Sequence, residues 1–462
     1  MHFMKKLLWF FIPFLGISLS VQSQITPEEI QFSRQGVQRL IFDEKQSITM
    51  AKLEPKNIIG LSTMHPQKNE HEIQPEIEIY QDQLKIKSEV IIQTKFWFGG
   101  FNPFVSYTLD LESSSGNGGF GFEFSDREGK ERFIVKIVFK DDKLNGVEFN
   151  LIRNTEEVVH LNLASNLDKN QCTKGKIILQ MLGSGFTLFH QENGLPKVIG
   201  QCDFNTFIDL REKKYLHSFQ SHLFVQLNQG EITINGVDMA INTGIGLADI
   251  RAITYEDGTP FLENGRLWYT MSVRGRALPH HIQGVFSLNP SVFDLKLEGI
   301  IVFDREDGLL RNEIASHLFY DRNQKLWRGL TTGFSAFANP EKEKKQLLAV
   351  ESQTDPRFGF SVMKAEPFGM VGDIEDPHIL FDGSANKWRM LTCENIDGYK
   401  AVILESDYWN KAYVRISGPV VHNSTGTSIQ KIGEKKYCFS GSSEGEIFIY
   451  TYPDLQEVGT LK

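Results

Sequence analysis

Between Glu76 and Ala240 the chain consists of short strand-like runs that follow one another closely. The runs alternate polar and apolar residues or are rich in β-branched and aromatic side chains, and turn sequences such as Asp141–Gly146 separate many of them. A period of two bounded by Gly, Asn and Asp predicts β-strands. About ten such strands, with no helical periodicity between them, predict a β-sandwich. The preceding stretch Ile25–Glu44 is weakly amphipathic and predicts either a short helix or a strand pair.

Within this half, the segment 176–194 (KIILQMLGSGFTLFHQENG) resembles the strand pairs of concanavalin-like and laminin-G-like jelly rolls. We therefore expect residues 24–240 to form a jelly-roll-like β-sandwich, and the chain as a whole to be all-β.

From residue 241 to residue 462 a longer repeat replaces this pattern. Each unit is a strand, a polar turn and a second strand that carries an aromatic side chain near its start. The units recur about every 50 to 60 residues, in the range of propeller blades. The first strands of the four units are Gly258–Leu262, Ser316–Asp321, Asp376–Asp382 and Gly426–Lys431. These units predict a β-propeller; the alternative is a second sandwich with coincidental aromatic spacing.

On these residues the second half resembles the five-bladed β-propeller glycoside hydrolases, a set that includes families 43, 32, 117 and 130. In those families an Asp-Pro or Glu-x-Pro element opens a strand at the axis, and Glu375-Asp376-Pro377 contains both forms. The segment Asp257–Phe261 resembles the version in the first blade. The resemblance implies a five-bladed propeller that cleaves glycosidic bonds. A fifth unit has to come from elsewhere, such as residues 244–256 or the N-terminal stretch.

Cleavage of a glycosidic bond needs one carboxylic acid to protonate the leaving oxygen and a second carboxylate to activate water or attack the sugar. A propeller gathers the starts of its inner strands at one axial mouth. We therefore expect Asp257 to be the base and Glu375 the acid, with a pKa raised by burial and by neighbouring charge. Asp376 is a second candidate for the acid, and Glu313 or Asp373 would tune and orient Glu375. Each of these carboxylates can instead cap a turn or pair with an arginine.

Weaker candidates lie in the loop after the first unit. Arg274, Arg276 and His281, with His280 beside it, suit a uronate or sulfate group, although a solvated loop is the simpler interpretation. We expect the unit tryptophans to pack in the blades, and Trp97 and Trp409 are candidate sugar platforms. The matching places of His317 and His378 indicate a structural role. Residues 441–445 match G-x-S-x-G but predict a hairpin turn. We find no metal-ligand spacing and no phosphate loop, and so expect no metal or cofactor.

The N-terminus predicts export. Residues 1–23 combine Lys5 and Lys6 with the apolar stretch Leu7–Leu19 and small residues before a cleavage site after Ser23, as in a signal peptide. We expect a soluble periplasmic or extracellular protein without a membrane anchor after cleavage. A formal charge of −9 disfavours nucleic acid as a partner.

The four cysteines exclude a disulfide scaffold. Cys172 and Cys202 are close enough in sequence to pair, and Cys393 and Cys438 are expected to be buried thiols.

The favoured function is a secreted glycoside hydrolase with a carbohydrate substrate. The alternative is a non-catalytic carbohydrate-binding or surface protein that keeps the propeller but has lost a carboxylate, and a two-sandwich adhesin is a third reading. The sugar, the linkage, the stereochemical outcome and the oligomeric state stay open.

Overall fold

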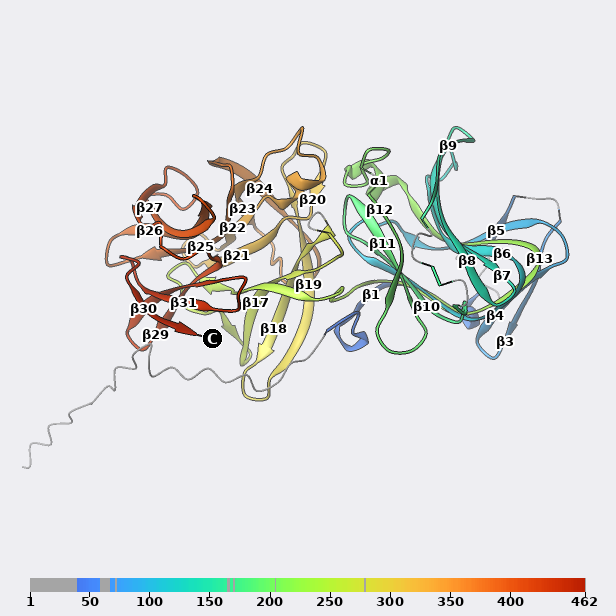
Figure 1. Ribbon diagram of the computed structural model, residues 1–462, viewed down its shortest axis with the longest axis horizontal. Coiled ribbons are helices and arrows are strands. Elements are labelled where there is room, and N and C mark those ends of the chain that lie inside the picture. The colour runs from blue at the N-terminus through green and yellow to red at the C-terminus, as the bar shows by residue number, and fades with distance from the viewer. Residues whose placement is uncertain are drawn as a thin grey trace, which may run out of the picture.

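The computed structural model describes residues 40–58, 67–70, 73–163, 167–168, 171–203, 205–277 and 280–461. Within these residues the chain is nearly all β-strand, with one short α-helix, α1 (Lys213–Ser218), and a few 3-10 turns (Figure 1). The expectation of an all-β protein is confirmed. The predicted signal peptide lies outside the described residues. None of the helices in the described part of the chain has the length and apolar character needed to cross a bilayer.

The first half forms a single 13-stranded sheet in which all the pairs are antiparallel. Its strands are β1 (Ile48–Leu53), β2 (Gln67–Asn69), β3 (Glu76–Tyr80), β4 (Gln83–Ser88), β5 (Ile92–Gly100), β6 (Ser106–Ser125), β7 (Glu131–Lys140), β8 (Lys143–Arg153), β9 (Glu156–Asn162), β10 (Gly175–Met181), β11 (Gly185–Gln191), β12 (Lys197–Asp203) and β13 (Gln220–Ile241).

Two long strands, β6 and β13, organise this sheet by pairing along almost their whole length. Their register shifts near Gly230, and the opposite Gly116 has a φ of 73°, where a Cβ atom would lie 2.0 Å from the Gln229 carbonyl oxygen. At one end of the pair β5 and β7 extend the sheet, and at the other β4, β1 and β10 do. The two long strands therefore take part in both ends of one bent sheet.

The core of this half is built from phenylalanines. Phe120, Phe122, Phe124, Phe133 and Phe149 are fully buried, and the rings of Phe124 and Phe133 lie 4.8 Å apart. Burial of each such side chain contributes roughly 1.5–3 kcal/mol, and close aromatic pairs add to it. The alternating pattern of the strands thus supplies one continuous apolar interior.

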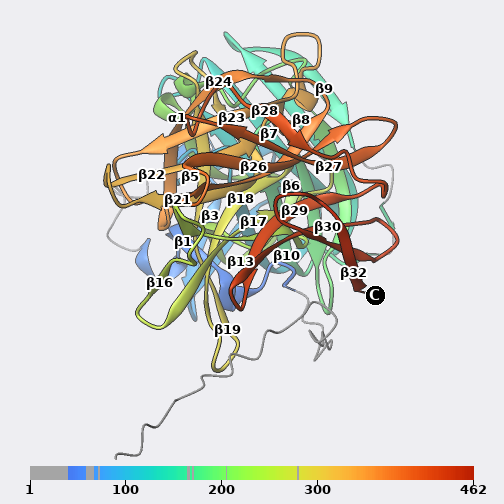
Figure 2. The same cartoon turned by 90° about the vertical axis from the view of Figure 1, so that its left-hand side faces the viewer.

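The second half contains four antiparallel four-stranded units, which we call blades, and its topology is propeller-like. This half faces the viewer in Figure 2. The first blade has β14 (Leu247–Ala252), β17 (Arg266–Val273), β18 (Ile282–Asn289) and β19 (Asp294–Asp304); the second has β21 (Ile314–Asp321), β22 (Leu326–Thr332), β23 (Gln346–Ser352) and β24 (Gly359–Val371); the third has β25 (Ile374–Asp382), β26 (Lys387–Asn395), β27 (Tyr399–Ser406) and β28 (Val414–Ser417); the fourth has β29 (Thr425–Ile432), β30 (Lys435–Gly441), β31 (Ile447–Thr451) and β32 (Glu457–Leu461).

The first strands of consecutive blades, β14, β21, β25 and β29, contact one another in turn, and we call them the inner strands. The outermost strands of the first two blades, β19 and β24, pair in parallel and join these blades into one sheet. Three short strands lie between blade strands: β15 (Thr254–Tyr255), β16 (Leu262–Glu263) and β20 (Leu310–Arg311). The described residues thus form four blades, whereas the resemblance implied five.

The first inner strand does not lie where the repeat predicted it. We expected it at Gly258–Leu262, but β14 pairs with β17 through Leu247–Val273 and Ala252–Tyr269. Residues 253–265 form an extension between these two strands, and β15 within it runs parallel to β21 of the next blade. Residues 244–256, considered above as a source of the fifth blade, therefore contain the inner strand of the first.

The cysteine and hairpin expectations have clear outcomes. All four cysteines are free; Cys393 and Cys438 are buried, as expected, and Cys172 and Cys202 are not paired. Residues 441–445 join the antiparallel strands β30 and β31, which confirms a hairpin in place of a nucleophile elbow.

Candidate functional site

Each inner strand has the same irregularity near its start. The register with the second strand shifts, and one residue there has a positive φ: Asp249 at 52°, Ala315 at 56°, Asp376 at 61° and Gly426 at 66°. These four residues are thus equivalent bulge positions of the four blades. Two of them carry a carboxylate, and Glu375 directly precedes one. Glu313 comes just before the inner strand of the second blade.

Asp376 ties the inner strands together. Its Oδ1 lies 3.3 Å from Nη2 of Arg251 in the first blade, and its Oδ2 accepts a hydrogen bond of 2.7 Å from the Gly426 N–H in the fourth. Its own N–H donates to Thr332 Oγ1 of the second blade at 3.0 Å. Burial raises the pKa of this carboxyl, the positive charge of Arg251 opposes that shift, and the negative charge of Asp249 adds to it. Both carboxylate oxygens therefore serve internal contacts.

Two histidines occupy the positions in the second and third blades that Arg251 occupies in the first. The rings of His317 and His378 stack with centroids 3.9 Å apart. His317 Nδ1 accepts a hydrogen bond of 3.2 Å from the Ile379 N–H. Burial, followed by the charge of Arg251, lowers the pKa of His317 to about 3, so this ring is neutral at physiological pH. The stacking supports the structural role expected from their matching positions.

Glu375 lies beside the bulge of the third blade, with a side chain that is 12% exposed. Its Oε2 accepts a hydrogen bond from Lys345, which also donates to the Tyr399 hydroxyl at 2.7 Å. Burial and the neighbouring Asp376 raise the pKa of Glu375, while Lys345 opposes this rise. Lys345 also lies 4.9 Å from the ring centroid of Phe334, a favourable position for a cation.

Asp373 belongs to the same group of side chains. It accepts hydrogen bonds of 2.9 Å from both Asn395 Nδ2 and the Tyr399 hydroxyl, and these bonds lower the pKa of Asp373. Lys345 Nζ is 3.6 Å from its Oδ1. The structure therefore brings Glu375 and Asp373 together around one lysine and one tyrosine.

Glu313 is buried behind the start of the second inner strand. It accepts hydrogen bonds from the Ser335 N–H at 2.8 Å and the Ser335 hydroxyl at 2.6 Å. Burial raises its pKa, and the charge of Glu343 adds to the rise. Ser335 also offers its carbonyl oxygen to Arg211 of the first half, at 3.4 Å.

A cavity of about 580 Å³ lies where the two halves of the chain meet, close to Glu313. Arg211 and Arg311 line it, are almost fully buried, and form ion pairs with Asp209 and Asp307. Glu343 in the same wall pairs with Arg311 at 3.0 Å. Both halves thus contribute walls to a polar cavity next to Glu313.

The structure does not bring Asp257 together with these residues. The extension that contains it lies beside the end of β21, and the bulges lie at the strand starts. Asp257 Oδ2 accepts from Arg322 at 2.8 Å and Oδ1 accepts from the Thr259 N–H at 2.9 Å. Burial works to raise the pKa of Asp257, but these hydrogen bonds outweigh it and hold the pKa below its ordinary value. These contacts are those of a turn-capping carboxylate, which was the alternative to a catalytic base. They arise because residues 253–265 form an extension between β14 and β17 and are not the inner strand of the first blade.

The loop after β17 holds the expected substrate-binding side chains. Arg274 and Arg276 are exposed, whereas His281 is buried and donates from Nδ1 to the Ala277 carbonyl oxygen at 2.9 Å. Burial and the charge of Arg274 lower the pKa of His281 to about 4, and the charge of Asp249 opposes this. Arg274 and His281 thus lie near the bulge of the first blade. The adjacent His280 pairs with Asp203 of the first half at 2.8 Å.

Sequence reasoning missed Asp249, Lys345 and Tyr399. The sequence does contain a signal for Asp249. Ala248–Arg251 aligns with Glu375–His378 when residues 247–252, in place of 258–262, are taken as the first inner strand. Lys345 stands in a run of charged residues, and no local pattern distinguishes it from its neighbours.

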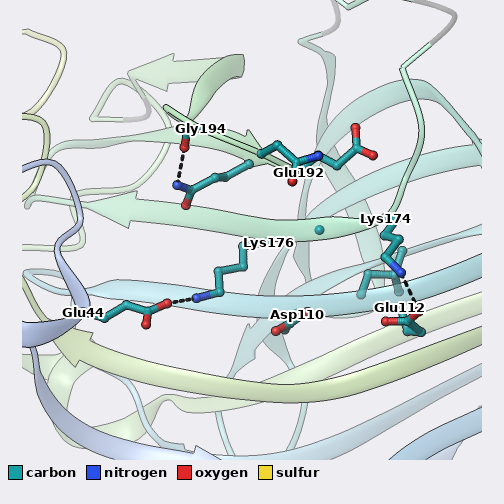
Figure 3. A pocket seen from close by; sticks show the side chains of 11 residues that line it. Glu44, Asp110, Glu112, Lys174, Lys176, Glu192 and Gly194 are labelled. Atoms are coloured by element: carbon teal, nitrogen blue, oxygen red, sulfur yellow. Dashed lines mark hydrogen bonds and ion pairs between the residues drawn. The ribbon is translucent and has the colours of Figure 1, made fainter.

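A different kind of cavity lies on the first half. It has a volume of about 390 Å³, and two pairs of its charged residues bond to each other, Lys176 with Glu44 and Lys174 with Glu112 (Figure 3). It contains none of the predicted site residues. Across the described ranges, no group of three or more His, Cys, Asp or Glu side chains is arranged to hold a metal ion.

Comparison with known proteins gives structural resemblances only. No family model matches the chain, and no curated protein matches it. The family 117 glycoside hydrolase Zg3597 of Zobellia galactanivorans is similar over 46% of this chain and 69% of that chain, with 9% identity and a TM-score of 0.35. A GH43_1 enzyme of Xanthomonas citri is similar over 46% and 74%, with 12% identity and a TM-score of 0.34. An α-L-arabinanase of Cellvibrio cellulosa covers 62% of this chain and 87% of its own, with 11% identity and a TM-score of 0.31.

Proposed function

We propose that the protein is an exported glycoside hydrolase that acts at the end of the blades where the inner strands begin. One observation carries the proposal: at this end the first and third blades carry Asp249 and Glu375 at or next to their bulges, and the second carries Glu313, buried behind its inner strand. Glycosidic cleavage needs such carboxylates from separate parts of a chain to face one sugar.

The roles follow from the surroundings of each group. Glu375 is the acid, because burial and Asp376 favour its protonated form. Asp249 takes the role of base or nucleophile that we first assigned to Asp257, since it occupies the bulge position and lies close enough to influence Asp376 and His281. Asp376 holds the blades together, and Asp373 and Tyr399 orient Lys345 against Glu375.

The first half contributes to substrate binding in this proposal. The cavity of about 580 Å³ is lined by both halves and lies next to Glu313 through Ser335 and Arg211. Binding sites are often found where two domains meet. A saccharide bound at Asp249 would also meet the loop that carries Arg274 and Arg276, because Arg274 lies near the bulge of the first blade.

A second candidate is a carbohydrate-binding protein without catalysis. The observation that favours it is that the buried carboxylates have internal partners: Glu375 has Lys345, Asp376 has Arg251 and Glu313 has Ser335. A catalytic acid has to release such a partner or share it with the substrate.

The test is product release from a panel of plant and algal polysaccharides, with the anomer of the product followed by NMR. We expect Glu375→Gln and Asp249→Asn each to abolish turnover and to keep the fold. Asp257→Asn is the matched control, because it removes a carboxylate from the other end of the blades, and it should retain turnover. If the intact chain binds a polysaccharide without releasing product, the binding alternative replaces the proposal. If Asp257→Asn is inactive and Asp249→Asn is active, the assignment of the base returns to Asp257.

A further inference from the structure

A cavity of about 350 Å³ lies between the second and third blades, at the end of the inner strands opposite to the bulges. Phe381, Trp388 and Trp409 of the third blade line it on one side. Asp321, Gln324 and Arg328 of the second blade line it on the other. It is separate from the candidate active site, which lies where the inner strands begin.

The cavity has no counterpart at the equivalent tryptophan of the second blade. Trp327 pairs with Tyr320 in the second blade as Trp388 pairs with Phe381 in the third. Trp327 is buried, with the Phe261 ring at 5.3 Å and the Arg357 guanidinium at 4.9 Å from its ring. Trp388 is partly exposed and faces the cavity. The blade packing that covers one tryptophan thus leaves the other accessible.

The aromatic walls are held in place by neighbouring side chains. The ring of Phe319 lies 5.3 Å from that of Trp388 and 6.2 Å from that of Trp409. The Arg328 guanidinium lies 5.0 Å from the Trp409 ring centroid and donates to Asp321 Oδ2 at 2.6 Å. These contacts fix the positions of both indoles at the edge of the cavity.

The chemistry of the lining selects a class of ligand. Flat aromatic faces pack against the apolar C–H face of a sugar ring, and amide groups at the rim bond to its hydroxyls. The exposed Asn323 and Gln324 supply such amides. Both carboxylates of the lining are paired, Glu256 with Arg322 at 2.7 Å and Asp321 with Arg328 at 2.6 Å, so the lining residues offer an anionic sugar no unpaired guanidinium.

We infer that this cavity, walled by Trp388 and Trp409, is a binding subsite for a neutral sugar residue of a saccharide. The subsite does not depend on the proposed hydrolysis, because it uses none of the carboxylates at the inner-strand starts. It would hold a polymer on the protein at a distance from the cleavage point.

The experiment measures binding of neutral hexaoses, namely xylohexaose, arabinohexaose, cellohexaose and mannohexaose, to the full-length mature chain carrying Glu375→Gln, so that turnover cannot interfere. We expect at least one hexaose to bind and to change the tryptophan fluorescence. Trp409→Ala should weaken this binding by about tenfold or more, the loss expected when one aromatic wall is removed.

Two further variants keep the test decisive. Gln324→Ala alters only an exposed rim amide, so it should fold normally and weaken binding by a few-fold. Tyr408→Ala is the matched control, because Tyr408 is an exposed aromatic residue next to Trp409 that does not line the cavity; its affinity should stay within twofold. The inference is overturned if no hexaose binds, if folded Trp409→Ala binds as well as the parent, or if hexagalacturonate binds more tightly than every neutral hexaose. Loss of hydrolysis in a protein that still binds through Trp409 would count against the proposed function alone.

Discussion

The guanidinium of Arg251 lies 3.3 Å from the carboxylate of Asp376, and both side chains are almost completely buried. The pair connects the inner strand of the first blade to that of the third, across residues that are far apart in the sequence. The other oxygen of Asp376 bonds to the fourth blade. One carboxylate therefore helps to hold three blades in position around the candidate site.

We predict that Asp376→Asn destabilises the protein by about 3–5 kcal/mol, because it leaves the buried guanidinium of Arg251 without its counter-charge. Urea unfolding followed by circular dichroism measures this loss. A double variant, Arg251→Met with Asp376→Asn, removes both charges and should be more stable than Asp376→Asn alone. Equal stabilities of the two variants would show that the ion pair has no such role.

The bulge positions allow a prediction about backbone strain. Gly426 has a φ of 66° and no atom within 4 Å of the place where a Cβ would lie, so Gly426→Ala adds only the strain of a left-handed residue. We expect a loss of about 1 kcal/mol, and a gain of up to about 1 kcal/mol for Ala315→Gly at the equivalent place. Thermal unfolding of both variants tests this, and a stabilised Gly426→Ala would contradict it.

The pair of Lys345 and Glu375 predicts a pH dependence. Because Lys345 lowers the pKa of Glu375, Lys345→Met should raise it and keep the acid protonated to higher pH. The alkaline limb of the kcat/KM profile, measured on the substrate found in the polysaccharide panel, should then move to higher pH. Lys344→Met, which removes the neighbouring lysine, should leave the limb in place. A shift to lower pH would exclude Glu375 as the acid.

Asp238, on β13, carries a separate pH effect on stability. Burial raises its pKa to about 6, although Lys176 and Lys52 oppose the shift. A carboxyl with a folded pKa above its unfolded pKa makes the protein less stable as the pH rises from about 4 to about 6. Asp238→Asn should therefore stabilise the protein by about 1–3 kcal/mol at pH 7.5 and have little effect at pH 3.5. Urea unfolding at both pH values measures the difference, and the same gain at both would show that ionisation is not the cause.

Much of the strand content was readable from the sequence, because alternation is a local property. The run EIEIY is strand β3, and the first strands of the second, third and fourth units lie in β21, β25 and β29. The long strands were harder to recognise: the runs that end near Ser113 and begin near Phe120 are one strand, β6. Glycines such as Gly116 look like a turn, but here they permit the close approach of β13.

The candidate site was only partly predictable, for a physical reason. Glu375, Asp376 and Glu313 come next to strong strand patterns, and the structure places them at the inner-strand starts. Asp257 was predicted as the base because the extension 253–265 resembles a repeat unit in sequence. Only the pairing of β14 with β17 shows that Asp249 occupies the bulge position of the first blade. Lys345 acts on Glu375 through tertiary contacts that no spacing encodes.

The parallel pairing of β19 with β24 has a consequence for the behaviour of the protein in concentrated solution. The free edge of a sheet invites strand addition by another molecule and so promotes aggregation. In the first two blades each outermost strand covers the edge of the other from Gly299 to Asp304. Intermolecular pairing is therefore blocked along this stretch. In the third and fourth blades the outermost strands are β28 and β32, and charged residues such as Arg415 and Glu457 discourage strand addition there.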